Sequence, residues 1–216
     1  MLLHLHSGWD TQSNTGWNDT NITAGIANDT PNSAKLTVTM TLHSWATGQA
    51  LQSWNSTGTI PAYSSRNFTK EHRKAFLGSH AATSVFLTAT TAVHSTVAED
   101  YQGEEDTTTA KMGGLKAHHF FTKMKAAELR DPQIKLVFGG SGGKLSVTLS
   151  CVAPAPNVFI DPGMLLGHFD DNGVLLLPNE PRTLIFDAMD QVNVTIERLQ
   201  AEVVARSPWS TLHPAF

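Results

Sequence analysis

Apolar and polar residues alternate along several short segments of the chain. In residues 34–42 (AKLTVTMTL) every second residue from Leu36 to Leu42 is apolar, a threonine stands between each pair, and Lys35 precedes the first. Successive side chains of a strand point to opposite faces, so this segment predicts a strand with one face in a core. The sequence Thr47-Gly48-Gln49 separates it from another strand candidate, residues 51–54, and predicts a hairpin turn.

The same type of pattern recurs further along the chain. Short β-type segments bounded by Gly, Pro and Asn predict strands at 84–91, 133–138, 144–152, 157–161, 173–177 and 182–187. Residues 192–204 alternate over their first half and predict a strand that closes the last sheet. Helical patterns are short, at 68–77 and 120–129, with about two turns each.

Short strands at this spacing are typical of antiparallel β-sandwiches. The run EDYQGEEDTTTAKMGG, residues 99–114, is acidic and almost free of apolar residues, so we interpret it as a long loop or a domain linker. We therefore predict an all-β chain of two antiparallel β-sandwich domains, at 18–114 and 115–216. An irregular N-terminal segment, residues 1–17, precedes them.

Composition supports a folded chain and excludes several classes of partner. The 216 residues are 40% hydrophobic and 16% charged, which is enough for two domains with proper cores. The net charge of −4 provides no basic field, so neither nucleic acid nor a membrane surface is expected as a partner. No apolar stretch approaches the roughly 18 residues that span a bilayer. The first ten residues lack the basic region of a signal peptide.

Residues that could hold a metal ion or cofactor do not form a recognisable site. Cys151 is the only cysteine, which excludes an internal disulfide and a multi-cysteine metal site. The neighbours His118 and His119 would point to opposite faces of a strand, and His4 and His6 share a face in the N-terminal segment. We expect solvated or core-edge histidines, no metal and no cofactor.

Two glycine-containing motifs predict turns. The cluster at 139–144 (GGSGGK) differs from a phosphate-binding loop because Phe138 stands at the first glycine position and a strand follows, so a hairpin is favoured. The sequence at 170–173 (DDNG) lacks the spacing of a calcium-binding EF-hand loop, and Asn-Gly is itself a turn signal.

The tryptophans and one glutamate are the candidate residues for contact with a sugar. An exposed aromatic ring can stack on a sugar ring, but burial in a sandwich core is the favoured interpretation, above all for Trp45. The five tryptophans are Trp9, Trp17, Trp45, Trp54 and Trp209. The dipeptide Asn179-Glu180 is similar to the acid/base of retaining glycosidases, yet it lies in a Pro-flanked turn, so Glu180 is assigned to the surface and no catalytic residue is predicted.

Asn-X-Ser/Thr sequons indicate possible N-glycosylation. They begin at Asn18, Asn21, Asn28, Asn55, Asn67 and Asn193. Their number favours a chain that follows the secretory or lysosomal/vacuolar route. Chance occurrence in a Thr-rich chain is the alternative.

Three motifs in the second half resemble the C-terminal immunoglobulin-like domain of β-mannosidases of glycoside hydrolase family 2. They are PNVFID at 156–161, GHFDDNG at 167–173 and RTLIF at 182–186. Upstream, HHFF at 118–121 is similar to the segment that leads into that domain. The segment LTVTMTLHSW at 36–45 is similar to a strand of the preceding sandwich domain.

The resemblance implies two immunoglobulin-like sandwiches that form the accessory C-terminal part of such an enzyme. Complete members of the family remove terminal β-linked mannose from oligosaccharides and glycoproteins by a retaining mechanism. Both catalytic glutamates lie in a (β/α)₈ barrel that precedes the region matched here, so this chain alone is expected to be inactive. The expected partner is that catalytic barrel, or a glycan.

Other interpretations remain open. A stand-alone carbohydrate-binding module would need an exposed aromatic pair on one face of a sandwich. A protein-interaction module could use an unpaired edge strand. A truncated gene product is a further possibility, because the chain starts at Met1 and enters a sandwich domain directly.

Overall fold

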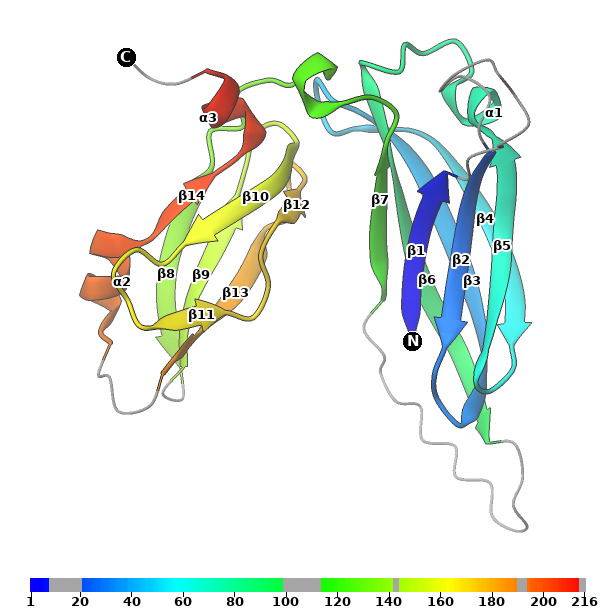
Figure 1. Cartoon of the computed structure of the whole chain (residues 1–216), viewed down its shortest axis with the longest axis horizontal. Coiled ribbons are helices and arrows are strands. Elements are labelled where there is room, and N and C mark those ends of the chain that lie inside the picture. Colours follow the sequence, from blue (N-terminus) through cyan, green and yellow to red (C-terminus); the bar gives the residue numbers. More distant parts are fainter. Residues whose placement is uncertain (8–20, 99–113, 142–143, 190–193, 214–216) are drawn as a thin grey trace. The chain divides into compact units, whose positions relative to one another are not determined.

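The computed structural model describes residues 1–7, 21–98, 114–141, 144–189 and 194–213, and these form mostly antiparallel strands (Figure 1). The chain divides into two compact units. The first contains Met1–Ser44 and Gln49–Thr122, and the second contains Trp45–Gly48 and Lys123–Phe216. The all-β prediction is therefore confirmed.

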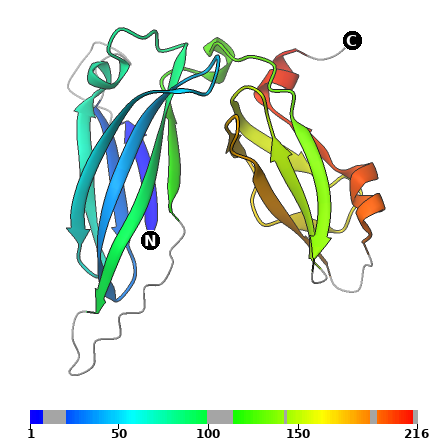
Figure 2. The same ribbon diagram turned by 180° about the vertical axis from the view of Figure 1, so that it is seen from behind.

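The described residues of the first unit form two antiparallel sheets and one short helix, α1 (Arg73–Leu77). Together the sheets have the seven strands of an immunoglobulin-like sandwich, visible from both sides in Figures 1 and 2. One sheet has the order β1 (Leu2–Ser7), β2 (Asn21–Asn28), β5 (Ser64–His72); the other has β4 (Ala50–Ile60), β3 (Asn32–Ser44), β6 (Val85–Ala98), β7 (Lys116–Phe120).

The core of the first unit follows the alternation in β3. Every second residue from Leu36 to Leu42 is buried, and these side chains share a core with Ile22 and Ile26 of the opposite sheet. The ring of Trp54 meets that of Phe76 edge-on at 5.0 Å. The predicted strand and its hairpin to β4 are confirmed.

The N-terminal segment differs from the expectation of an irregular 1–17. Residues Leu2–Ser7 form β1, which pairs with β2 from Leu2↔Ala27 to Ser7↔Ile22, and Leu3 is buried. The sequence places His4 and His6 on one face here, but it did not predict a strand in this polar terminal segment, and the strand depends on β2 for its hydrogen-bonding partners. The rest of that segment, residues 8–17, lies outside the described residues.

The acidic run also connects elements within one unit. Strand β7 pairs with β6 from Phe86↔Phe120 to Thr90↔Lys116, so the run joins two neighbouring strands of the same sheet. All of the run except its last residue, Gly114, lies outside the described residues. Because β7 belongs to this sheet, the division by contacts falls between Thr122 and Lys123, whereas the sequence placed the domain boundary at 114/115.

The second unit repeats the seven-strand, two-sheet design. One sheet has the order β11 (Gly167–Phe169), β13 (Arg182–Ala188), β9 (Lys144–Ser150), β8 (Lys135–Ser141); the other has β12 (Val174–Leu176), β10 (Ala155–Asp161), β14 (Val204–Arg206). Apolar side chains of both sheets, such as Leu149, Ile160 and Phe186, share a core. Strands β8 and β9 pair as far as Ser141↔Lys144, which confirms the hairpin at the glycine cluster.

The predicted closing strand at 192–204 is wrong for most of its length. Residues Ile196–Glu202 form helix α2. Thr195 is its N-cap, and the Thr195 hydroxyl accepts a hydrogen bond from the Arg198 amide at 3.3 Å. The helix buries Leu199. A capping threonine ahead of good helix-forming residues outweighs the alternation that continues into the helix, and in the described part of this segment β14 is the only strand.

Both predicted helices are shorter in the structure than their sequence patterns indicated. The segment 68–77 is strand β5 as far as His72, and only α1 is helical. The segment 120–129 contains a single 3₁₀ turn, η2 (Met124–Ala126). A third helix, α3 (Pro208–Leu212), follows β14.

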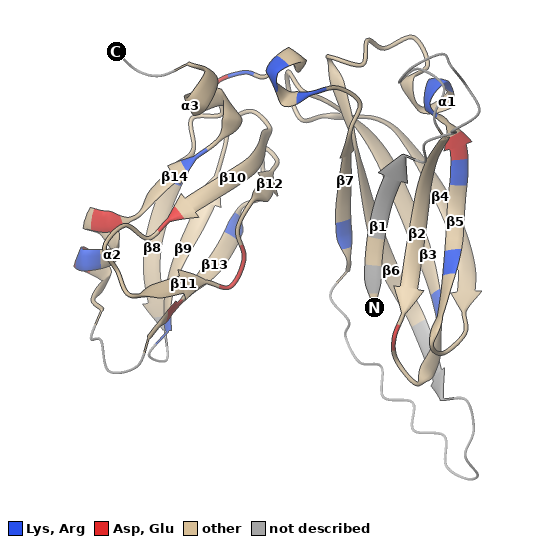
Figure 3. Cartoon of the chain, in the orientation of Figure 1, with Lys and Arg blue, Asp and Glu red and all other residues tan. Residues whose placement is uncertain are grey.

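Charged residues are scattered over both units in Figure 3, without a stripe of one sign. Within the described ranges, none of the helices has the length and hydropathy needed to cross a membrane.

Candidate functional site

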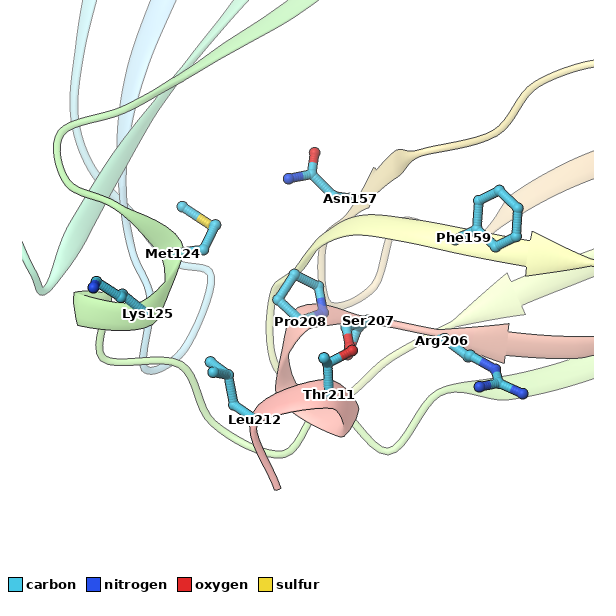
Figure 4. A pocket seen from close by; sticks show the side chains of 9 residues that line it. All are labelled: Met124, Lys125, Asn157, Phe159, Arg206, Ser207, Pro208, Thr211 and Leu212. Carbon is cyan, nitrogen blue, oxygen red and sulfur yellow. The ribbon is translucent and has the colours of Figure 1, made fainter. Parts of the chain in front are cut away.

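A pocket of about 440 Å³ opens on the second unit (Figure 4). It is formed by η2, β10, the end of β14 and α3. Its lining residues are Met124, Lys125, Asn157, Phe159, Arg206, Ser207, Pro208, Thr211 and Leu212. The volume lies within the range of small-molecule sites, and the walls are largely apolar with a few polar groups, as in such sites.

Strand β10 supplies the exposed aromatic ring of the pocket. Along this strand Val158 and Ile160 are buried, while Asn157 and Phe159 point outward. Phe159 remains 52% exposed. The pairing with β12 shifts register between Ala155 and Val158, and Asn157 has a φ of 48°. This irregularity is a β-bulge. It interrupts the pairing of β10 with β12 at Asn157, and the side-chain amide of this residue lies beside the pocket.

The opposite wall is fixed by the start of α3. Ser207 is buried, and its backbone amide donates to the Ser210 hydroxyl at 3.0 Å in a capping box. Pro208 occupies the first helical position, where its fixed φ suits the helix. This cap holds Thr211 and Leu212 at the pocket.

The acidic DDNG motif has a structural role. Asp170 pairs with the backbone of Ile185 in both directions, at 2.9 Å each. The Asp171 carboxylate accepts a hydrogen bond from Arg182. Asn172 donates to the Ile160 carbonyl and accepts from its amide. The motif is therefore a turn, as predicted, and it links β10 to β13.

Glu180 lies where the sequence placed it. It is exposed in a turn closed by a bridge to Leu177, and Asn179 in that turn has a φ of 65°. Retaining glycosidases need two carboxyl groups about 5–5.5 Å apart across a substrate. No Asp or Glu is among the described residues that line the pocket, so the pocket has no group for that reaction.

The two neighbouring histidines lie on opposite faces of β7, as predicted. His118 stacks on Phe120 with centroids 4.7 Å apart, and His119 meets Phe121 edge-on at 5.3 Å. Burial lowers the pKa of both, and Arg73 adds repulsion that brings the pKa of His119 to about 4. These rings are neutral packing groups, and no cluster of potential metal ligands occurs among the described residues.

The lone thiol is also a packing group. Burial raises the pKa of Cys151 to about 11, so the thiol stays protonated at neutral pH.

The tryptophans do not provide an exposed sugar platform in the described ranges. Trp45 is fully buried, as favoured from the sequence, and Trp54 is half-buried against Phe76. Trp209 is half-buried, and one of its faces stacks on His213 at 3.7 Å. Trp9 and Trp17 lie outside the described residues.

The sequons differ in accessibility. Asn21, Asn55 and Asn67 are exposed on strands of the first unit, whereas Asn28 is only 2% exposed. The Asn28 amide nitrogen donates to two carbonyls, those of Asn32 and Pro61, and its oxygen accepts from Thr30. Asn18 and Asn193 lie outside the described residues.

A small apolar patch lies on the second unit, formed by Met164, Leu166 and Met189. Their exposed fractions are 80%, 59% and 63%. The Met189 amide donates to the Leu166 carbonyl at 3.1 Å, which places the two side by side. Exposed apolar side chains that adjoin one another are candidates for a contact surface.

Sequence reasoning identified none of the pocket residues as a site. Two pocket residues, Asn157 and Phe159, could have been identified from the sequence. They occupy the outward positions of β10 and alternate with buried residues in an otherwise apolar segment. An aromatic ring at an outward strand position is unusual unless something covers it. Arg206 and α3 had no such signal, since their approach to β10 is a tertiary contact.

Two family models match the chain in tandem. A mannosidase Ig/CBM-like domain matches residues 20–102, and an Ig-fold domain of the mannosidase type matches residues 129–211. No curated protein matches the sequence.

Solved structures include a similar fold. The crystal structure of a β-D-mannosidase from Dictyoglomus thermophilum matches with a TM-score of 0.61 and 13% sequence identity. The match covers 95% of this chain but only 21% of that protein, so the chain spans about a fifth of its length.

Proposed function

We propose that this chain, which consists of two immunoglobulin-like accessory domains of the mannosidase type, is the non-catalytic C-terminal region of a β-mannosidase-like glycoside hydrolase of family 2. The observation that carries the proposal is the tandem of the two family domains in one chain. Each domain alone is a common sandwich fold, and fold by itself does not imply function. The pair in this order is a more specific signature than either domain.

The chemistry of the described residues agrees with a non-catalytic role. The acidic residues of the most recognisable motif, Asp170 and Asp171, bind the backbone of Ile185 and the guanidinium of Arg182. Carboxylates held in this way are not free to protonate a leaving group or attack a sugar ring. Hydrolysis of terminal β-D-mannosides would therefore belong to a separate catalytic domain.

A catalytic barrel is the proposed partner, and the patch of Met164, Leu166 and Met189 is the proposed contact. The patch is apolar and exposed on a unit whose own core is already complete. About four-fifths of the similar mannosidase lies outside the matched part, which leaves room for a barrel of about 250 residues. Burial of these side chains against it would remove apolar surface from water.

Turnover measurements test the non-catalytic role. The purified 216-residue chain is expected to release no product from an aryl β-mannoside, while a complete β-mannosidase in the same buffer does. Turnover by the chain alone would overturn the proposal.

The accessory role has a separate test. An antibody raised against the chain is used on extracts of its source, followed by an assay of the captured material. We expect β-mannosidase activity to be captured, either in a longer polypeptide or in a complex. Capture of the chain without any such activity would contradict the role.

A further inference from the structure

The pocket on the second unit contains an aromatic ring and a guanidinium group in direct register. Phe159 of β10 pairs with Arg206 of β14, so their side chains leave the sheet on the same face. Directly opposed residues of an antiparallel pair have Cβ atoms about 4.5–5.5 Å apart. Figure 4 shows both side chains at the strand end of the pocket. The sheet thus brings a flat apolar face and a planar cation to the same end of the pocket, although Figure 4 shows the two side chains directed away from each other.

Polar groups without charge complete this end of the pocket. The Asn157 amide stands two residues before Phe159 on the same side of β10, held there by the bulge. The Thr211 hydroxyl comes from α3, whose first turn is fixed by the Ser207 cap. An amide and a hydroxyl can each donate to and accept from a sugar hydroxyl.

The charge of the pocket has one sign. Lys125 and Arg206 are its two charged lining residues, and no carboxylate lines it. Neither forms an ion pair with any residue in the described ranges. Exposed cations beside an apolar surface favour a ligand that carries negative charge, because guanidinium can bind a carboxylate or phosphate with two hydrogen bonds.

We propose that this pocket binds an acidic saccharide, with a sugar ring on Phe159 at one wall and a carboxylate or phosphate group of the same ligand on Arg206 at another. Asn157 and Thr211 hydrogen-bond the ring hydroxyls, and Lys125 raises the local concentration of the anion. The site goes beyond the accessory role proposed above, and neither depends on the other. We propose it as a binding site only, because no carboxyl or imidazole group is among the described residues that line it.

Calorimetric titration of the complete chain tests the proposal with three probes. A mannuronate disaccharide carries a carboxylate, mannose 6-phosphate carries a phosphate, and mannobiose is neutral. We expect at least one acidic probe to bind about tenfold more tightly than mannobiose, as loss of a charge-assisted hydrogen bond implies. Comparison of the two acidic probes identifies which anion the site prefers. Equal affinity for mannobiose, or no binding of any probe at millimolar concentration, would overturn the proposal.

Variants locate the binding. Arg206→Gln and Phe159→Ala are each expected to lower the affinity for the acidic probe about tenfold. Asn157→Gly is expected to lower it less. Asn157→Gly protects against loss of folding, because glycine adopts the positive φ at this position readily. Arg198→Gln, on the exposed surface of α2, and Val137→Ala, exposed on β8, are the matched controls. Unchanged affinity in all three pocket variants would place the ligand elsewhere and refute this site.

Discussion

Asn172 and Ile160 are joined by two hydrogen bonds that run in opposite directions. The Ile160 amide donates to Asn172 Oδ1 at 2.8 Å, and Asn172 Nδ2 donates to the Ile160 carbonyl at 2.9 Å. The side-chain amide thus pairs with the backbone of β10 as another strand would. The turn after β11 is fixed to the opposite sheet by this one residue.

Replacement of Asn172 should therefore destabilise the second unit. Asn172→Ala leaves both backbone groups of Ile160 without their partner, and we expect a loss of about 1–3 kcal/mol in the free energy of unfolding. Asn172→Asp keeps the acceptor but loses the donor, and should lie between the alanine variant and the wild type. Urea unfolding measures both, with Asn55→Ala on the exposed face of β4 as control. A loss no larger than that of the control would contradict the role assigned to this pair.

Gly167 leaves no room for a side chain. A Cβ at this position would lie 2.4 Å from Cζ of Phe186 and 2.5 Å from the Asp187 carbonyl oxygen. We expect Gly167→Ala to lower the free energy of unfolding by about 1–3 kcal/mol, as overpacking does. Gly139→Ala is the matched control in the same sheet, since its nearest contact would be 3.6 Å. Equal melting temperatures for the two variants would contradict the close contact of Gly167 with Phe186 and Asp187.

Stability should fall in mild acid because of His119. Its pKa in the folded chain is about 4, against 6.5 for an unburied histidine. Between these two pH values His119 is protonated in the unfolded chain but neutral in the folded chain. The free energy of unfolding therefore decreases as pH falls, by at most about 1.4 kcal/mol per pH unit. The slope falls to about half its maximum at pH 6.5 and vanishes about one pH unit higher, where both states are deprotonated.

The variant His119→Phe should flatten this dependence. Unfolding free energies at pH 7 and pH 5 are compared for the wild type, this variant and His80→Phe at an exposed turn. We expect the difference between the two pH values to shrink only for His119→Phe. A difference that survives the substitution would assign the acid sensitivity to another group, such as His118.

Glycosylation should distinguish the sequons of the first unit. When the chain is expressed with a secretory leader in yeast, we expect glycans at Asn55 and Asn67, which are exposed, and none at Asn28. A glycan on Asn28 would displace its hydrogen bonds to Asn32 and Pro61. Intact mass before and after glycan removal, for Asn→Gln variants at each site, measures the outcome. Loss of a glycan in Asn28→Gln would show that the buried position is modified before folding.

The sequence predicted the fold class and most strands because alternation reflects burial directly. In β3 the apolar positions from Leu36 to Leu42 are the buried ones. The turn at DDNG and the surface position of Glu180 were likewise predictable from local chemistry, since turn residues act through their own backbone.

Features that depend on tertiary partners could not be predicted. Strand β1 requires β2, and the sequence of its six residues gives no sign of that pairing. The alternation in the segment of α2 predicted a strand, but the segment is helical behind its threonine cap. The candidate site needs Phe159, Arg206 and α3 together, and the register that joins the first two does not follow from either segment alone.

The DDNG turn has a consequence for how such chains are recognised in genomes. Its three polar side chains are occupied by the backbone of Ile160 and Ile185 and by Arg182, so the letters that make the motif conspicuous report how one sandwich is assembled. A search that finds this motif finds a domain, whatever enzyme or non-enzyme surrounds it. Assignment of hydrolytic activity from such a hit requires the glutamates of a catalytic barrel to be found in the same polypeptide.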